Sequence, residues 1–345
     1  MQVGLRGLRT RPYAVRNGEM NGQHFGIKTW RRCGMTDSER AGELRAFLMN
    51  DPEVRFAEQV QLRTLCTFRV GGEAEFCIWP ESRDALRRVI CRLRSLGIYY
   101  RVFGNGSNVL FDDRGFSGAA VFLTRLNHIS RDGCRISAEA GVSVTQLAVY
   151  AQRAGLTGME FLYGIPGSVG GAVYMNAGAY DGEIAGICER TFCYLPKEDR
   201  YTVHEREDND FGYRHSRFME NAELVTGADF LLAPGDPDVI RCRMEELMVR
   251  RQSKQPLEFG SAGSTFKRYP GTFTGKLIED AGLKGVSIGG AQVSQKHAGF
   301  IINTGTASGA DITALIRYVQ DAVREKYGIG LECEVELIPF EKERY

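Results

Sequence analysis

The sequence predicts a mixed α/β protein, and three observations lead to this fold class. Short segments rich in β-branched and aromatic residues alternate with amphipathic segments of helical period, as where residues 74–79 are followed by 82–97. Two glycine-rich loops, at 104–108 and 159–184, interrupt this alternation. The chain has 345 residues, which is enough for two or three domains.

Each element of the first half has a local signal. Ser82 and Gly97 bound a helix with an apolar face, because serine favours a helix start and glycine a helix end. The pattern of Ser143 and Gln146 is that of a capping box, and it opens a helix that ends at Gly155. The other expected elements are a helix over 39–49, a strand-like segment at 66–70 that leads into a turn at Gly71-Gly72, and strands over 74–79, 99–103, 109–111, 121–123 and 134–138.

The second half continues the mixed pattern. A proline at position 237, directly after Asp236, begins a helix that runs to about residue 252. We expect Asp311 to cap a last helix, and the segment 331–338 to be a strand whose apolar and glutamate side chains alternate between two faces. The remaining expected elements are strands around 190–195, 223–229, 286–288 and 298–303 and a helix over 275–281.

Composition excludes several classes of protein. The 44 basic and 43 acidic residues give a net charge of +1, which argues against a nucleic-acid binder. The apolar runs are shorter than the roughly 20 residues that a membrane helix needs. The nine cysteines are spread singly without a Cys-x-x-Cys pair, so we expect neither a disulfide framework nor a metal site. We expect the protein to work in a reducing cytoplasm.

The beginning of the chain differs from the rest. Residues 1–18 contain four arginines and no acid, and residues 1–40 show no apolar period. We interpret residues 1–40 as a disordered extension. An organelle-targeting peptide is the alternative, because such peptides are rich in arginine and poor in acids.

The loop at 159–184 has the composition of thin, buried backbone. It holds six glycines, many apolar side chains and no lysine or arginine. Glycine lets the main chain approach a ligand and present its N–H groups to an anion such as a pyrophosphate. The alternative is a tightly packed turn region. The turn at 104–108 is open to the same two interpretations, since Asn-Gly is also a common hairpin turn. It is not the dinucleotide fingerprint, because that motif opens a helix and Asn108 leads into a strand.

Three polar residues are candidates for chemistry, although each has an ordinary alternative. Ser264 lies in a loop between Gly263 and Thr265, where a turn hydroxyl or helix cap is the common role. Arg214 lies among polar and aromatic residues and could form a surface salt bridge. Glu334 lies between two other glutamates of one strand and could be part of a solvated edge.

Seven segments of the chain form a recognisable set: 67–72, 104–108, 164–172, 213–218, 263–267, 289–300 and 332–335. Together they resemble the UDP-N-acetylenolpyruvoylglucosamine reductase family, over roughly residues 60–340. Two departures from the family pattern are Cys333, where proline is frequent, and Arg268, where asparagine is frequent; Arg268 puts local substrate contacts in doubt.

The resemblance implies a particular fold. An FAD-binding region of the p-cresol methylhydroxylase/vanillyl-alcohol oxidase type is expected over 41–255, completed by 329–340, with a substrate-binding α/β domain over 256–328. It also implies FAD contacts, catalytic roles for Arg214, Ser264 and Glu334, and substrate contacts from Lys267 and His297. The implied FAD contacts are Gly104, Asn105, Gly106, Ser107, Asn108, Gly164, Pro166, Gly167, Ser168, Gly170, Gly171, Ala172, Asn176 and Gly178.

The resemblance further implies NADPH as reductant and UDP-N-acetylglucosamine enolpyruvate as substrate, in peptidoglycan precursor synthesis. In this chemistry Arg214 and Glu334 stabilise the substrate carboxylate while Ser264 gives a proton to C2. Arg214 and Ser264 lie 50 residues apart, too few for the substrate-capping tyrosine loop of one subtype, so we expect the shorter subtype. We separately expect a monomer. The rival functions are a flavin oxidase of the same fold that acts on a sugar or alcohol, and a non-catalytic nucleotide-sugar-binding regulator.

Overall fold

The computed structural model describes residues 35–341. Helix α1 (Asp37–Met49) is its first element, close to the predicted start near Ser38. Thr36 caps this helix: its hydroxyl accepts the Glu39 N–H at 3.2 Å, and the Glu39 carboxylate accepts the Thr36 N–H. The arginine-rich residues 1–34 lie outside the described residues, so both interpretations of that segment stay predictions.

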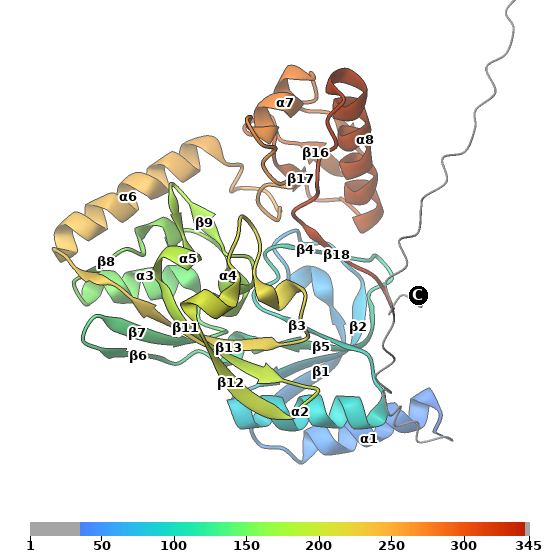
Figure 1. The fold of residues 1–345 in the computed structure, drawn as a ribbon. Helices are drawn as coiled ribbons and strands as arrows, with labels where there is room; N and C mark the ends of the chain where they lie inside the picture. The colour runs from blue at the N-terminus through green and yellow to red at the C-terminus, as the bar shows by residue number, and fades with distance from the viewer. Residues whose placement is uncertain (1–34, 342–345) are drawn as a thin grey trace, which may run out of the picture. The chain divides into compact units, whose positions relative to one another are not determined.

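A four-stranded sheet with helices α1 and α2 against one side forms the first part of the fold (Figure 1). Its strand order is β1-β2-β5-β3, in which only the β1–β2 pair is antiparallel. Ser82 caps α2 and Gly97 ends it in a left-handed conformation, as predicted. The bounds are β1 (Val54–Gln61), β2 (Glu73–Pro80), α2 (Arg83–Leu96), β3 (Tyr100–Phe103) and β5 (Phe116–Phe122).

A five-stranded antiparallel sheet, of order β12-β11-β13-β7-β6, forms the second part. Helices α3, α4 and α6 share one apolar core with this sheet (Figure 1). Asp236 caps α6 as expected, with Pro237 at the first helical position. The bounds are β6 (Ile129–Asp132), β7 (Arg135–Glu139), α3 (Val144–Arg153), α4 (Val169–Tyr174), β11 (Cys188–Leu195), β12 (Arg200–Glu205), β13 (Leu224–Leu231) and α6 (Pro237–Lys254).

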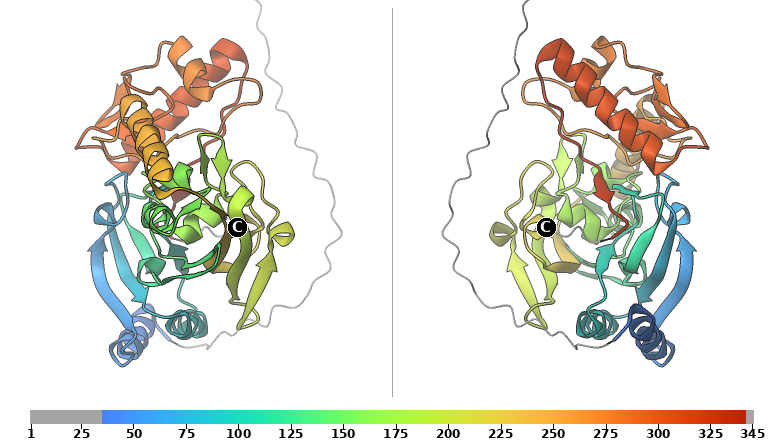
Figure 2. Two further views of the ribbon diagram at one scale, coloured as in Figure 1. Left: turned by 90° about the vertical axis from the view of Figure 1, so that its left-hand side faces the viewer. Right: turned by 90° about the vertical axis from the view of Figure 1, so that its right-hand side faces the viewer.

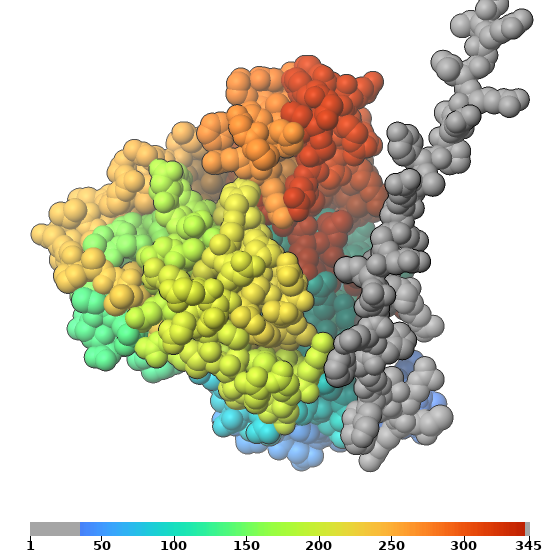
Figure 3. Space-filling view, viewed as in Figure 1, coloured from blue at the N-terminus to red at the C-terminus, as the bar shows by residue number. Residues whose placement is uncertain are grey.

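The third part is a three-stranded antiparallel sheet, β15-β16-β17, with helices α7 and α8. Its core is continuous with that of the first sheet: Phe111 and Phe116 belong to the same apolar cluster as Ile312 and Val319. In the space-filling view this orange-to-red part abuts the yellow-green surface of the second part (Figure 3). The bounds are α7 (Thr274–Asp280), β15 (Ser287–Ile288), β16 (Ala291–Val293), β17 (Ile301–Asn303) and α8 (Gly309–Tyr327).

After α8 the chain returns to the first part (Figures 1 and 2). Strand β18 (Glu336–Ile338) pairs in parallel with β4 (Val109–Phe111), and the N–H of Glu336 donates to the Asn108 carbonyl at 3.0 Å. The Asn108 side chain donates to the Glu334 carbonyl at 2.9 Å. This pairing fixes Glu334 beside the turn at 104–108.

Four local predictions are wrong. Residues 66–70 form a turn, with Arg69 at φ 57°, and the strand in this region is β1. The Ser143 side chain makes no capping hydrogen bond, although Ser143 does precede the first residue of α3. Ser308, and not Asp311, caps α8; Asp311 is the acidic third residue of its capping box.

The alternation over 331–338 fails only at its end. Leu331 and Val335 are buried as expected, but Leu337 is exposed and Ile338 is buried. The segment pairs first with residues 265–267 and then with β4, and only 336–338 is a strand. No helix of residues 35–341 is long and apolar enough to cross a bilayer. The remaining short elements are η1 (Leu62–Thr64), η2 (Leu123–Arg125), β8 (Leu156–Thr157), η3 (Glu160–Leu162), β9 (Gly178–Ala179), β10 (Gly182–Glu183), α5 (Ile184–Ile187), η4 (Arg206–Asn209), η5 (Arg217–Met219) and β14 (Ala233–Pro234).

Candidate active site

An ion pair between Arg214 and Glu334 joins two distant parts of the chain. The Nε of Arg214 lies 2.7 Å from Oε1 of Glu334, and the side chains are only 22% and 12% exposed. The Nη2 of Arg214 also donates to the Gly178 carbonyl at 3.1 Å. The pair therefore lies between the segment that follows α8 and the hairpin β9–β10, and the two ordinary interpretations, a surface salt bridge and a solvated edge, do not describe it.

The backbone holds Arg214 at the tip of a tight turn. Gly212 and His215 exchange backbone hydrogen bonds of 3.1 and 3.2 Å, and Arg214 has φ 53°, which is uncommon for a side chain of this size. Ser216 donates to the Tyr174 carbonyl at 2.6 Å, at the end of α4. Such strained positions persist only where the surroundings fix them, and they are frequent at functional sites.

Asn176 fixes the same turn from the other side. Its amide nitrogen donates to the Gly212 carbonyl at 2.9 Å, and its amide oxygen accepts the N–H of Ala185 at 2.9 Å. The side chain is 1% exposed. Because both polar atoms have partners within the protein, Asn176 supports the Arg214 turn, and the proposed FAD contact of Asn176 could come only from other atoms.

Ser264 lies next to the Arg214–Glu334 pair in the backbone pairing. The N–H of Glu334 donates to the Thr265 carbonyl at 2.8 Å, and the N–H of Lys267 donates to the Glu332 carbonyl at 2.9 Å. These bonds join the loop that carries Ser264 to the segment that carries Glu334. The Ser264 residue is exposed, and its hydroxyl has no hydrogen-bond partner within residues 35–341. The three predicted catalytic residues are thus brought into one neighbourhood.

Burial dominates the electrostatics of Glu334. Desolvation raises the pKa of its carboxyl group, and the charges of Arg214 and Lys267 pull the pKa the other way. Desolvation is the larger effect, so the protonated form is easier to reach than for an ordinary glutamate. A carboxyl group of this kind can donate a hydrogen bond to an anion.

The turn at 104–108 has the geometry of an anion site. Two of its carbonyl groups are occupied by the protein: that of Gly106 accepts the N–H of Thr67 at 3.1 Å and that of Asn108 accepts the N–H of Glu336 at 3.0 Å. Within the part of the chain that the structure describes, the N–H groups of 104–107 donate to no protein acceptor. Gly106 has φ 62°, and a Cβ there would collide with the Leu65 carbonyl. Free N–H groups on a glycine turn fit a phosphate group.

The second glycine-rich loop lies directly beside this turn. The amide nitrogen of Asn105 donates to the Pro166 carbonyl at 3.3 Å, and a Cβ on Gly104 would collide with the Ser168 hydroxyl. Gly167 and Ser168 come just before α4, and their N–H groups also lack a protein acceptor among the described residues. The two loops therefore form one continuous stretch of thin backbone, which fits FAD.

The prediction that the whole stretch offers N–H groups needs correction at 169–172. The N–H groups of Val169 and Gly170 donate at 2.8 Å to the carbonyls of Val142 and Ala140. The N–H groups of Gly171 and Ala172 donate to Ser168. Here the packing interpretation holds, since a Cβ on Gly170 would lie 2.9 Å from that of Ala140. The N–H groups of Gly170, Gly171 and Ala172 are therefore not free to bind FAD.

The two residues predicted to contact substrate have local partners. Lys267 forms an ion pair of 2.5 Å with Glu332. His297 accepts the N–H of Gly299 on Nδ1 at 3.1 Å, its ring packs on Phe300, and burial lowers its pKa. Lys267 lies in the loop of Ser264, whereas His297 packs near Gly275 of α7, so their substrate contacts stay predictions.

Two residues near the site were not predicted. The Tyr213 hydroxyl accepts the N–H of Arg268 at 3.0 Å and so connects the Arg214 turn to the Ser264 loop. Arg251 is buried near the end of α6, against Gly164. Tyr213 begins the segment 213–218 that carries the resemblance, but no role was assigned to it. Arg251 carried no sequence signal, because it follows another arginine on a helix rich in charge.

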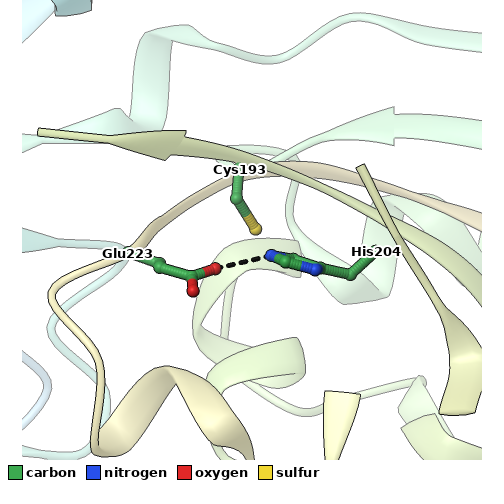
Figure 4. A group of neighbouring side chains, drawn as sticks. All are labelled: Cys193, His204 and Glu223. Carbon is green, nitrogen blue, oxygen red and sulfur yellow. Dashed lines mark hydrogen bonds and ion pairs between the residues drawn. The ribbon is translucent and has the colours of Figure 1, made fainter. Parts of the chain in front are cut away.

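One further cluster has the composition of a metal site. Cys193, His204 and Glu223 are the only three such side chains of residues 35–341 whose ligand atoms lie within 4.8 Å of one another. Figure 4 shows the His204 ring directed at the Glu223 carboxylate, at 2.6 Å. Arg217 already binds the other oxygen of Glu223 at 3.1 Å, and burial raises the pKa of Cys193. The hydrogen bonds account for this cluster without a cation.

Comparison with known proteins agrees with the fold and the site. Residues 74–196, which contain both glycine-rich loops, match the family model of an FAD binding domain. The protein is therefore an FAD-binding protein of mixed α/β fold. Residues 255–338, which contain Ser264 and Glu334, match the model of the UDP-N-acetylenolpyruvoylglucosamine reductase C-terminal domain.

Whole-chain relatives identify the particular family. The UDP-N-acetylenolpyruvoylglucosamine reductase of Pediococcus pentosaceus is 44% identical over 291 residues, which cover 84% of this chain and 97% of the relative. That of Streptococcus pneumoniae is 44% identical over 83% of this chain and 94% of the relative. The crystal structure of the Thermus caldophilus enzyme has a TM-score of 0.71 and 35% identity, and covers 83% of this chain and 99% of that one. The chain belongs to the UDP-N-acetylenolpyruvoylglucosamine reductase family.

Proposed function

We propose that this chain catalyses the NADPH-dependent reduction of UDP-N-acetylglucosamine enolpyruvate to UDP-N-acetylmuramate with FAD, in peptidoglycan precursor synthesis. The observation that carries the proposal is the buried Arg214–Glu334 pair of 2.7 Å beside the Ser264 loop. Family membership supplies the reaction, and these residues supply the chemistry that the reaction needs.

The glycine-rich loops would hold the cofactor. The N–H groups of 104–107, Gly167 and Ser168 are the donors available for a diphosphate, and the glycines leave the space that it needs. Bound FAD supplies the hydride for C3 of the enolpyruvyl group after it has been reduced by NADPH. The protein must then stabilise negative charge on the substrate carboxylate and deliver a proton to C2.

Arg214 is suited to the first of these tasks. Its guanidinium can neutralise the substrate carboxylate, which competes with Glu334 for the same positive charge. When Arg214 turns to the substrate, Glu334 loses the charge that lowers its pKa, and burial then favours the protonated acid. The protonated Glu334 donates a hydrogen bond to the same carboxylate and stabilises the charge that develops there.

Ser264 is suited to the second task. Its hydroxyl has no protein partner among the described residues, so it is available to a ligand. Serine is a weak acid, but a carbanion at C2 is a strong base, and a hydroxyl held close to it can give up its proton. The resulting alkoxide regains a proton from water.

The subtype is the finer part of the proposal. Residues 215–264 are largely taken up by η5, β13, β14 and α6, and the longest stretch outside them, 255–264, is the loop that carries Ser264. We assign the chain to the shorter subtype on this basis. We also propose a cytoplasmic monomer: the eight cysteines within the described residues are free thiols, which supports a reducing compartment, and light scattering would test the monomer.

A visible absorbance spectrum followed by anaerobic titration tests the function. We expect a flavin spectrum that NADPH bleaches and that the enolpyruvyl nucleotide restores in a stoichiometric amount. A colourless protein would indicate a non-catalytic nucleotide-sugar-binding regulator. A flavin that oxygen and a simple sugar or alcohol turn over, but the enolpyruvyl nucleotide does not, would indicate an oxidase of the same fold.

A further inference from the structure

Arg251 is a buried arginine without an acidic partner in the part of the chain that the structure describes. It lies in the last turn of α6 and is 6% exposed. Its Nη1 donates to the Gln255 side chain at 3.3 Å. Its Nε and Nη2 are buried, and neither has a hydrogen-bond partner among residues 35–341.

The surroundings of Arg251 belong to the glycine-rich region. A Cβ on Gly164, which has φ 82°, would lie 3.4 Å from both Cδ and Nε of Arg251 and 2.8 Å from the sulfur of Met248. On another side the guanidinium lies over the Tyr180 ring, 5.5 Å from its centroid. Because Gly164 has no side chain, there is space for the Arg251 side chain beside it.

Tyr180 connects Arg251 to the candidate active site. It lies at the tip of the hairpin β9–β10, two residues after Gly178, whose carbonyl accepts the hydrogen bond from Arg214. Arg214 and Arg251 thus contact the same short hairpin. Gly164, which touches Arg251, begins the loop that leads to the N–H groups of Gly167 and Ser168.

An unpaired guanidinium is expensive to bury, because it loses water and gains no counter-charge. Desolvation lowers the pKa of Arg251, and only Tyr180 acts in the other direction. The guanidinium nevertheless remains charged at neutral pH. The two atoms without partners, Nε and Nη2, are neighbours on one edge of the guanidinium. That edge is the one that binds two oxygens of a phosphate in parallel.

We propose that Arg251 binds a phosphate group of a nucleotide ligand through Nε and Nη2. This inference rests on the proposed function, which brings three such ligands to the site: FAD, NADPH and the nucleotide-sugar substrate. All three offer the same chemistry to the guanidinium. Their affinities, measured separately, show which of them supplies the phosphate.

The test compares Arg251→Met with Arg250→Met in the FAD-loaded protein. Arg250 is the adjacent residue of α6, but it is 53% exposed and pairs with Glu246, so it is a matched control. The first measurement is the dissociation constant of FAD. The second is the dissociation constant of UDP and that of uridine, each monitored through changes in the flavin spectrum. The third is the dependence of the flavin reduction rate on NADPH concentration.

We expect Arg251→Met to weaken one of the three phosphate ligands by about 10- to 100-fold, and Arg250→Met to weaken none. If UDP is the one affected, uridine binding should not change, because uridine has no phosphate. Arg251→Lys keeps the positive charge but loses the two parallel N–H donors of the guanidinium, so it should lose less affinity than Arg251→Met. Unchanged affinities for FAD, UDP and NADPH in Arg251→Met would overturn the proposal, and so would a fall in melting temperature alone.

These measurements separate this inference from the proposed function. Failure of the wild-type protein to reduce the enolpyruvyl nucleotide, together with weaker FAD or NADPH binding in Arg251→Met, would reject the function and keep the phosphate site. Full wild-type turnover with three unchanged affinities in Arg251→Met would reject the phosphate site alone.

Discussion

Asn176 holds the turn of Arg214 through one hydrogen bond, from its side-chain amide to the Gly212 carbonyl at 2.9 Å. Asn176 follows α4 and the second glycine-rich loop, while Arg214 faces Glu334. The residue proposed to bind the substrate carboxylate is therefore mounted on the segment proposed to surround the flavin. A displacement of the segment around Asn176 would therefore also displace the Arg214 turn.

Asn176→Ala should slow flavin reoxidation by the enolpyruvyl substrate on the order of 100-fold, because a small displacement of a catalytic group has that effect. Flavin reduction by NADPH does not use Arg214 and should change little. Stopped-flow absorbance measures both half-reactions. Asn221→Ala, at an exposed asparagine after the same turn, is the control and should behave as wild type. Equal slowing of the two half-reactions would show that Asn176 acts on the flavin site as a whole.

Ser264→Ala should leave flavin reduction nearly intact and slow reoxidation by about 10²- to 10⁴-fold, or more where no water can replace the hydroxyl. The reason is that hydride transfer to C3 needs a proton at C2. Ser261→Ala changes a serine of the same loop and should have no such effect. The proton-donor role is refuted if reoxidation by the substrate proceeds at the wild-type rate.

The pH dependence of reoxidation should report Glu334. Burial raises the pKa of this carboxyl group, and the protonated form is the one that donates a hydrogen bond to substrate. The rate should therefore be highest at low pH and fall as the pH rises through the pKa of Glu334. In Glu334→Gln the amide N–H donates at every pH, so this fall should disappear. Single-turnover reoxidation from about pH 5 to about pH 9 measures it, and a profile that persists in the glutamine variant would assign the titration to another group.

Gly106→Ala should yield a protein that has lost most of its FAD. The added Cβ meets the Leu65 carbonyl, and the positive φ is strained for alanine, so the turn at 104–108 must shift. The ratio of flavin to protein absorbance after gel filtration measures the loss. Gly42→Ala, on helix α1, is the control, since a Cβ there meets nothing within 4 Å. Full FAD content in Gly106→Ala would show that this turn is not part of the cofactor site.

Local signals in the sequence predicted the elements that depend on local chemistry. Ser82 and Gly97 set the limits of α2, and Asp236 with Pro237 set the start of α6, as expected from capping. The predictions failed where a distant partner decides the conformation. Residues 331–335 pair only with residues 265–267, through isolated hydrogen bonds, and 336–338 then form a strand with β4.

The same division applies to the site. The resemblance named Arg214, Ser264 and Glu334 one by one, but only the fold shows that Glu334 pairs with Arg214 and hydrogen-bonds the Ser264 loop. The role of Asn176 depends on a contact 36 residues away, and Arg251 is notable only because its partners are missing among the described residues. Sequence patterns of residue type carry no information about such contacts.

The continuous core of Phe111, Phe116, Ile312 and Val319 makes the first and third parts of the fold depend on each other for stability. Separating them would expose these side chains to water, so neither part should swing away as a rigid lobe when substrate enters. Access to the site must then come from movements of individual loops and side chains. Heat or denaturant should melt both parts together, in one cooperative transition followed equally by flavin release and by circular dichroism.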